Sequence, residues 1–449
     1  MAMVVKNNMS AVRTLATLNN NNTALSDSLS KVASGLKINS AKDDASGYAI
    51  SERMRVQMRS LDQANQNTQN ASSLMKNAEG AVERTVDILR TLKQKAIDAA
   101  TDTNTDDDRA TIQKELDQFI DQIDDNALIT FNGKYLLEGS RAASGTAVKT
   151  HMTNQNLATN TTNSTALTDL ANRNGESLEI NSGDRVTVSF VLQGRTYTST
   201  MTSVSSGTTL SNVFSMFASA TNAGTTVDSA TFGGIDATNS IQGSIIGTAA
   251  SGKKIFTRDG ESAITLIAKK AGLEGQISGL SISVSDSEGN VKKATNTALD
   301  AFKTSIYASN DTADGSVSFQ IGASANQAIK VGLMDMRSEA LGLKGKDGTT
   351  IQITTRAAAN AAVSAFDNAL SKALDQQTTI GAISARLDYT ASNLTTSSEN
   401  VQAAESTIRD ADMAKEMTNY TKNNVLLQAA QSMLAQANQN SSAVLSLLQ

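Results

Sequence analysis

One glycine-rich segment approaches the spacing of a nucleotide-binding loop. Gly247, Gly252 and Lys253 are spaced as in a phosphate-binding P-loop, but Lys254 stands where a Ser or Thr would hold magnesium. The residues that follow are typical of a strand, whereas a P-loop leads into a helix. We therefore expect a glycine turn here rather than a nucleotide site.

The acidic run from Asp102 to Asp108 begins like a calcium-binding loop. An EF-hand, however, requires glycine where this chain has Asp107 and a bidentate Glu where it has Gln113. Negative side chains also stabilise the first turn of a helix. The run therefore predicts a helix beginning at Thr105, and no metal site.

The chain lacks the residues on which most catalytic sites depend. The absence of cysteine excludes a thiol nucleophile, a zinc–thiolate site and a disulfide scaffold. His151 is the one histidine, so no Ser/His/Asp set can be assembled, and we expect it in a solvated polar loop. Asp43 and Asp44 are adjacent and do not share a face, while Ser40 with Asp43 matches a helix-capping pattern. We predict no catalytic residue, cofactor or metal, and no enzyme.

Composition and charge argue against some classes of binding partner. The 449 residues carry a net charge of −5, which gives no general reason to bind nucleic acid or an anionic membrane. The first residues lack the apolar core of a cleaved signal peptide, and no apolar run approaches the roughly 18 residues of a membrane span. Proline, which breaks helix interiors, is absent from the whole chain.

The elements around these segments are helical at both ends of the chain. Apolar residues recur with a period of 3.5 over residues 11–36, 61–99, 380–408 and 426–447, which is typical of coiled-coil packing. Ser60 and Gln63 match a capping box at the start of the second run. Isolated amphipathic helices are marginal in water, so we expect the two ends to pack together.

The middle of the chain has the two-residue period of strands. Residues 185–192 and 195–198 flank Gln193-Gly194 and predict a β-hairpin, and residues 280–284 and 317–321 predict further strands. Residues 210–218 predict a short helix, and Phe131–Tyr135 predicts a second hairpin turn. The middle is therefore expected to form one or two β-rich domains.

Two blocks resemble the signatures of bacterial flagellins. Residues 34–50 (SGLKINSAKDDASGYAI) are similar to the N-terminal signature, and residues 433–439 (MLAQANQ) with 444–448 are similar to the C-terminal one. Four shorter motifs stand in family order between them: Glu79-Gly80-Ala81, Phe131-Asn132-Gly133, Phe319-Gln320-Ile321-Gly322 and Arg409-Asp410-Ala411-Asp412. The resemblance covers about residues 1–140 and 319–449.

The resemblance implies a mixed fold, in which paired N- and C-terminal segments form a long α-helical coiled-coil bundle with a β-rich inserted outer domain. Residues 1–44 with 409–449 would be the inner core, residues 45–140 with 319–408 a helical shell with a β-hairpin, and residues 141–318 the variable outer domain. The implied function is that of the structural subunit of the extracellular flagellar filament, a propeller for motility. For residues 141–318, adhesion, glycan binding, immune recognition and O-glycosylation stay open, and a metalloprotease insert would need an H-E-x-x-H motif that they lack.

The periodic apolar positions are our candidates for polymerisation. A contact that does not close on itself generates an open helical filament, and the terminal seams can bury apolar surface only against each other and neighbouring copies. We expect the termini to be largely disordered in the monomer and helical in the filament. The predicted seam residues are Leu15, Leu18, Leu25, Leu29, Val32, Leu36, Leu426, Met433, Val444 and Leu447.

The family resemblance also implies partners. Besides copies of itself, the chain would contact the flagellar cap and hook-junction proteins. It would leave the cell through the flagellar type III apparatus without signal cleavage. A cytoplasmic export chaperone would mask the C-terminal helix, and our candidates for that surface are Leu426, Leu427, Met433 and Leu434.

One receptor patch of the family is altered in this chain. Many flagellins activate an innate-immune toll-like receptor through an Arg- and Leu-bearing patch, which aligns with the stretch around Arg90. Thr91 stands where activating members carry Arg, and Lys95 where they carry Leu, while Glu115 matches the acidic partner on the next helix. Loss of a planar donor and an apolar anchor weakens such an interface, so we expect weak or absent activation.

Overall fold

The computed structural model describes residues 8–222, 225–226, 235–239 and 245–447; for residues 225–226, 235–239, 441 and 443–447 only the backbone is described. The described chain divides into two compact units. The first contains the residues up to Gln69, Gln320–Gln327, and those from Tyr389 onward. The second contains Asn70–Phe319 and Ala328–Asp388.

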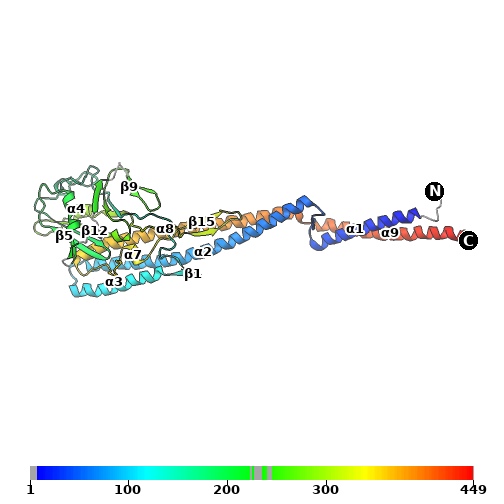
Figure 1. The fold of residues 1–449 in the computed structure, drawn as a ribbon, viewed down its shortest axis with the longest axis horizontal. Helices are drawn as coiled ribbons and strands as arrows, with labels where there is room; N and C mark the ends of the chain where they lie inside the picture. Colours follow the sequence, from blue (N-terminus) through cyan, green and yellow to red (C-terminus); the bar gives the residue numbers. More distant parts are fainter. Residues whose placement is uncertain (1–7, 223–224, 227–234, 240–244, 448–449) are drawn as a thin grey trace. The chain divides into compact units, whose positions relative to one another are not determined.

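The first unit is built from helices of both chain ends. In sequence order they are α1 (Met9–Ser34), the start of α2 (Ala45–Ala99), the end of α8 (Arg356–Arg409) and α9 (Met413–Leu447). The helices α1 and α9 lie side by side, as Figure 1 shows for the blue and red ends of the chain. The predicted pairing of the two ends is therefore confirmed.

Short-range polar contacts fix where the N-terminal helices begin and end. Asn8 accepts a hydrogen bond from the Ala11 amide at the start of α1, and Gly35 ends the helix with φ 73°. The Asp44 carboxylate accepts hydrogen bonds from the Ser46 and Gly47 amides at the start of α2. A Cβ on Gly47 would lie 2.5 Å from that carboxylate, so any larger residue there would have to displace the Asp44 side chain.

Two expected capping sites are corrected. Ser60 does not begin a helix, because α2 runs without interruption from Ala45 and the Ser60 hydroxyl bonds the Val56 carbonyl one turn back. Ser40 and Asp43 do bond each other, but they form a turn before α2, and Asp44 caps the helix instead. Asp44 was missed because the adjacent Asp43 offers a second carboxylate at nearly the same spacing.

The long helix α2 confirms the second heptad run in full. Every periodic position from residue 61 to residue 99 is buried, although two of them are threonines. Thr68 and Thr85 satisfy their hydroxyls by donating to carbonyls four residues back, at 2.8 and 3.1 Å. The buried positions are Leu61, Ala64, Thr68, Ala71, Met75, Ala78, Val82, Thr85, Leu89, Leu92, Ala96 and Ala99.

The third predicted helix is α3 (Asp106–Ala127), and its start is as expected. Thr105 and Asp108 form a reciprocal capping box, with the acidic run in the first turn. Arg109 is buried and donates to the Ala99 and Thr101 carbonyls, at 2.9 and 2.8 Å, which joins α3 to the end of α2. The hairpin β1 (Thr130–Phe131) and β2 (Lys134–Tyr135) follows, with positive φ at its two turn residues.

The middle of the chain forms two larger antiparallel sheets in the second unit. One has the strand order β12-β4-β5-β6-β7 and the other β13-β3-β11-β8. The bounds of the first are β12 (Ile277–Ser285), β4 (Arg185–Leu192), β5 (Arg195–Met201), β6 (Thr221–Asn222) and β7 (Thr225–Thr226). Those of the second are β13 (Phe302–Ile306), β3 (His151–Asn154), β11 (Ile264–Ala268) and β8 (Ile235–Asn239).

These sheets enclose a hydrophobic core of their own, which includes α4 (Leu210–Ser219). Phe190 of β4 packs edge-on against Phe217 of α4, with ring centroids 5.2 Å apart, and Phe214 meets Phe302 at 6.4 Å. The predicted hairpin, strands and short helix are confirmed. The remaining elements are β9 (Ile245–Thr248), β10 (Lys254–Phe256), α6 (Lys293–Leu299), β14 (Val317–Gln320), β15 (Ala328–Val331), α7 (Ser338–Leu341) and two 3-10 turns at Leu167–Asp169 and Leu273–Gly275.

Candidate functional site

The segments that approached ligand-binding loops have structural roles. Gly252 turns with φ 78° between the paired strands β9 and β10, as expected of a glycine turn. Asp102 pairs with Arg356 at 2.9 Å, and Asp106 pairs with Arg109 at 2.9 Å. In the described part of the chain, no three His, Asp or Glu side chains gather as a metal site would require.

His151 is not in a solvated loop, so that expectation was wrong. It begins β3, half-buried, and its Nδ1 lies 3.2 Å from the Ile246 carbonyl oxygen. Burial lowers the pKa of the imidazole. Polar neighbours in sequence misled the prediction, because Thr150, Thr153 and Asn154 are themselves buried.

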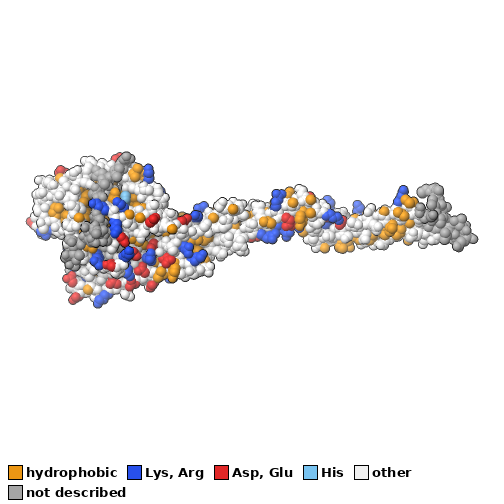
Figure 2. Space-filling model, viewed as in Figure 1, with side chains coloured by type: hydrophobic (Ala, Val, Ile, Leu, Met, Phe, Trp, Pro, Cys, Tyr) orange, Lys and Arg blue, Asp and Glu red, His pale blue; other side chains and the backbone are white. Residues whose placement is uncertain are grey.

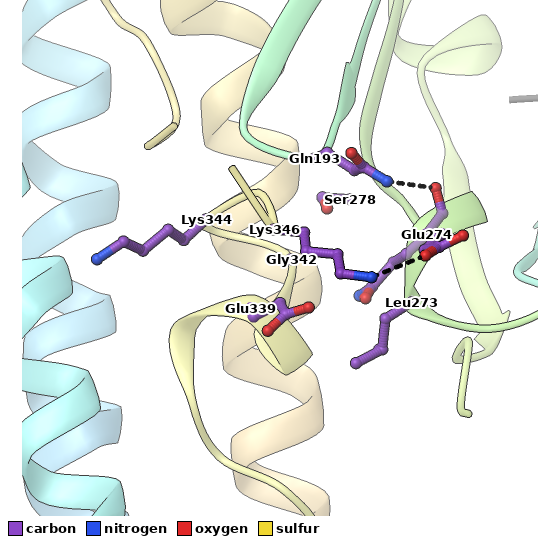
Figure 3. Close-up of a pocket in the computed structure, with 9 residues that line it drawn as sticks. Gln193, Leu273, Glu274, Ser278, Glu339, Gly342, Lys344 and Lys346 are labelled. Atoms are coloured by element: carbon purple, nitrogen blue, oxygen red, sulfur yellow. Dashed lines mark hydrogen bonds and ion pairs between the residues drawn. The ribbon is translucent and has the colours of Figure 1, made fainter. Parts of the chain in front are cut away.

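The enclosed pocket drawn in Figure 3 is too small for an organic ligand. Its free volume of about 10 Å³ suits a single water molecule. Gln193 donates to the Glu274 carbonyl and Lys346 pairs with the Glu274 carboxylate at 3.2 Å, so these polar groups already have partners. The contacts of Gln193 and Lys346 with Glu274 therefore hold these loops together.

The helix pair of the first unit is different, because asparagine amides form hydrogen bonds across its internal interface. The Asn423 side chain donates to the Ala24 carbonyl and to the Ser28 hydroxyl, at 3.2 and 3.0 Å. Asn21 donates to the Leu426 carbonyl at 3.2 Å. Asparagine amides that bond carbonyls of the opposite helix set the antiparallel register of α1 against α9.

Very little of this pair is buried. Ser28 is the one buried residue of α1, and Ala430 is the one buried among the described side chains of α9. Figure 2 shows hydrophobic side chains on the surface of the helix pair. Large apolar side chains on that surface, with their exposed fractions, are Met9 58%, Val12 58%, Leu15 47%, Leu29 51%, Met413 43%, Met417 45%, Val425 59%, Leu426 42% and Met433 64%.

The predicted seam residues fall into two groups. Leu18, Leu25, Val32 and Leu36 are half-buried, whereas Leu15, Leu29, Leu426 and Met433 are exposed. Leu15 and Leu29 are two heptads apart and share a face, as do Leu426 and Met433 one heptad apart. Val444 and Leu447 have backbones within α9, but their side chains lie outside the described residues. Each helix thus turns one apolar row inward, interleaved with asparagine and serine, and a second apolar row outward.

The amide contacts of Asn8, Asn21 and Asn423 were not predicted. The apolar period identifies leucines and valines, and an asparagine within it is only an interruption. The usable signal was Asn21, three residues after Leu18 and four before Leu25, which places it on the same helix face as these two leucines.

A buried arginine joins the two helix junctions of the first unit. Arg409 bonds the Glu52 carboxylate at 2.7 Å and lies over the Tyr48 ring, 5.3 Å from its centroid. The Lys37 amide bonds the Arg409 carbonyl at 2.7 Å, and the Ala411 amide bonds the Gly35 carbonyl at 3.0 Å. The start of α9 is therefore held beside the end of α1.

The receptor-patch residues lie on α2 and α3 of the second unit. Lys95 forms an ion pair with Glu115, with its Nζ 2.8 Å from Oε2. The Thr91 hydroxyl donates to the Asp87 carbonyl, and the Arg90 guanidinium pairs with the Asp87 carboxylate. Glu115 is thus already bound by an internal cation.

No helix in the described residues is both long and apolar enough to cross a membrane. The family profile described as the bacterial flagellin N-terminal helical region matches residues 5–142. The profile of the bacterial flagellin C-terminal helical region matches residues 363–448.

Relatives that align over nearly the whole chain are flagellins as well. The flagellin of Clostridium tyrobutyricum is 34% identical over 438 residues, which cover 97% of this chain and 99% of the relative. The flagellin of Bacillus subtilis is 29% identical and is covered throughout, with 99% of this chain aligned. Among solved structures, flagellar hook associated protein-3 of Legionella pneumophila aligns with 79% of this chain and 97% of its own at 14% identity, with a TM-score of 0.33.

Proposed function

Because the chain belongs to the bacterial flagellin family, and is therefore a structural subunit of the flagellar filament rather than an enzyme, we propose that the α1–α9 pair carries its main polymerisation surface. The observation behind this proposal is the second apolar row that the pair leaves uncovered. Among the described side chains, each of the two long helices buries only one residue, while leucine and methionine are exposed on the outside.

Packing against neighbouring copies would cover that outward apolar surface. Each Leu or Val side chain that becomes fully buried contributes roughly 1.5–3 kcal/mol. Several such residues per subunit suffice to offset the entropy of ordering the terminal helices. Within an isolated chain the same pair has few buried contacts, so it is the part expected to unfold first.

The three-layer organisation follows as a proposal. Residues 1–44 with 409–449 form the inner core, residues 45–140 with 319–408 the shell, and residues 141–318 the outer domain. In support, the two family profiles match near the ends of the chain, and the two larger sheets fall between residues 141 and 318.

The same surface serves export before it serves assembly. An export chaperone that covers α9 would bind the apolar positions Leu426, Leu427, Met433 and Leu434, of which Leu426 and Met433 are exposed. The chain then passes through the type III apparatus without signal cleavage and meets the hook-junction and cap proteins at the filament ends. Toll-like receptor activation is weak, because Lys95 already forms an ion pair with Glu115 and Thr91 offers no guanidinium.

Double substitution of Leu15→Ala and Leu29→Ala tests the polymerisation surface. Both side chains are about half exposed, so the folded monomer loses little stability, while the filament loses two apolar contacts. The critical concentration for polymerisation, measured by sedimentation, should rise at least tenfold, since 1.4 kcal/mol corresponds to a factor of ten.

Val291→Ala is the matched control, because Val291 is 47% exposed, like Leu15, but lies in the proposed outer domain. It should leave the critical concentration unchanged. Unaltered assembly of the Leu15→Ala/Leu29→Ala chain, or of a chain without residues 1–30, would show that the terminal pair is not the polymerisation surface.

A further inference from the structure

A cationic and apolar pair of side chains lies free on the first part of α2. Val56 is 57% exposed, and Arg59 three residues later is also exposed. The Arg59 Nε donates to the Arg55 carbonyl at 3.4 Å, but the ion pairs of the described residues include none for Arg59. Its guanidinium therefore keeps its charge-assisted donors available.

Val56 and Arg59 line a groove of about 410 Å³ within the first unit. Its opposite wall is the loop Gln320–Gln327, from which Gln320, Gly322 and Ala323 contribute. The loop is held in place, because Asn67 donates to the Gln320 carbonyl and the Gln320 side chain bonds the Gly322 and Ser324 carbonyls. The groove is thus a formed surface with one unpaired cation on its rim.

The second unit carries a surface of opposite charge at the end of α3. Asp125 is exposed and Leu128, the C-cap residue, is 46% exposed. The two carboxylates nearest to Asp125 along this helix are engaged: Asp121 pairs with Lys344 at 2.9 Å, and Asp124 accepts from Ser338 at 2.7 and 2.8 Å. The carbonyl end of a helix adds negative potential to that of Asp125.

We propose that the groove at Val56 and Arg59 receives the C-terminal end of α3 from a neighbouring copy of this chain, with Arg59 bonded to Asp125 and Val56 packed on Leu128. The two pairs have the same three-residue spacing in opposite order. Antiparallel contact of the helices therefore aligns cation with anion and apolar with apolar at once. The inference rests on the proposed function, since it names a second contact between the same subunits.

A charge exchange tests this contact in the full-length chain. Arg59→Glu and Asp125→Arg should each raise the critical concentration roughly tenfold, because each places like charges opposite each other. The Arg59→Glu/Asp125→Arg double variant restores the attraction in reverse and should polymerise within about threefold of the original chain. A double variant that assembles no better than the single variants overturns the proposal.

Two matched variants separate this contact from general charge effects. Arg53→Glu changes an exposed arginine of α2 that does not line the groove, and Asp107→Arg changes an exposed carboxylate at the other end of α3. Neither should shift the critical concentration by more than about twofold. If these controls raise the critical concentration as much as Arg59→Glu and Asp125→Arg do, the proposal is also overturned. Failure of the terminal-pair proposal would instead appear only in the Leu15→Ala/Leu29→Ala chain.

Discussion

Lys372 of α8 brings an ammonium group into the interior of the second unit. It donates one hydrogen bond, to the Ala340 carbonyl at 2.6 Å, and its Nζ lies 5.8 Å from the centroid of the Tyr307 ring. Burial lowers the pKa of Lys372 to about 8, against a smaller opposing effect of Asp335. Burial also raises the pKa of Tyr307 to about 12, with Asp375 adding to the shift.

These two groups make the free energy of unfolding depend on pH in opposite directions, the lysine over one pH range and the tyrosine over a higher one. Between pH 8 and 10.5 the unfolded chain keeps the lysine proton that the folded chain has lost, so the free energy of unfolding rises with pH. The lysine pKa difference corresponds to roughly 3 kcal/mol. Between pH 10 and 12 only the unfolded tyrosine is ionised, so the free energy of unfolding falls again.

Lys372→Met should therefore raise the free energy of unfolding at pH 7 by about 1–3 kcal/mol, because an apolar side chain replaces a poorly paired buried charge. The gain over the original chain should shrink as pH rises from 8 to 10. Denaturant titrations at several pH values measure both effects.

Lys303→Met, at an exposed position of β13, is the control and should change stability by less than about 0.5 kcal/mol at any pH. A difference between the original chain and Lys372→Met that does not vary with pH would contradict the assigned role of Lys372.

At the level of helices, the sequence predicted burial best where the apolar face of a helix packs against other parts of the same chain. Every periodic position from Leu61 to Ala99 is buried, because that face of α2 is covered within the subunit. The run over residues 11–36 has the same period, yet Leu15 and Leu29 are exposed. Period shows that a helix has an apolar face; it does not show whether that face meets its own chain or another one.

The sequence therefore predicted which residues belong to the candidate surface. It did not predict which of them face the partner helix and which face solvent. Its leucines followed from the heptads, whereas the contacts of Asn21 and Asn423 with backbone carbonyls depend on the register of two segments about 400 residues apart. His151 shows the same limit on a smaller scale, since a partner on another strand buries it.

The α2–α3 patch leads to a prediction at this scale. Thr91→Arg with Lys95→Leu supplies the guanidinium and apolar anchor of activating flagellins and releases Glu115 from its ion pair. A cell reporter for the flagellin-sensing toll-like receptor, exposed to monomeric protein, should respond at roughly tenfold lower concentration or better.

Lys114→Leu, which adds an exposed leucine beside Glu115 without freeing it, is the matched control and should leave the response unchanged. An unchanged response to the Thr91→Arg/Lys95→Leu variant would show that these two positions do not limit recognition.

Over the whole molecule, the helical ends and the β-rich middle differ in where they place their apolar residues. The terminal helices leave apolar surface open, while the β-rich middle buries Phe190, Phe217 and their neighbours in a core of its own. Neither kind contains proline. Helices explain the absence at the ends, but turns tolerate proline, so prompt folding after export is our hypothesis for the middle.

Ala166→Pro tests that hypothesis at a permissive site. Ala166 has φ −66°, which proline shares, and its bridge to Thr209 uses the amides of Leu167 and Leu210 instead of its own. Stopped-flow refolding of the variant should show an added phase of tens of seconds that a prolyl isomerase accelerates.

Ala166→Ser should refold like the original chain, without such a phase. A proline variant that refolds as fast as the original would mean that isomerisation places no constraint on this part of the sequence.

The amide bonds across the α1–α9 pair also have a thermal consequence. Burial of apolar surface is driven by entropy near 25 °C, carries a large negative heat-capacity change, and weakens on cooling. The leucine and methionine contacts that we propose between subunits would be of this kind, whereas the amide bonds of Asn21 and Asn423 within a subunit are not. A filament built in this way loses strength in the cold first at the joints between subunits, while each subunit keeps the alignment of its own two ends.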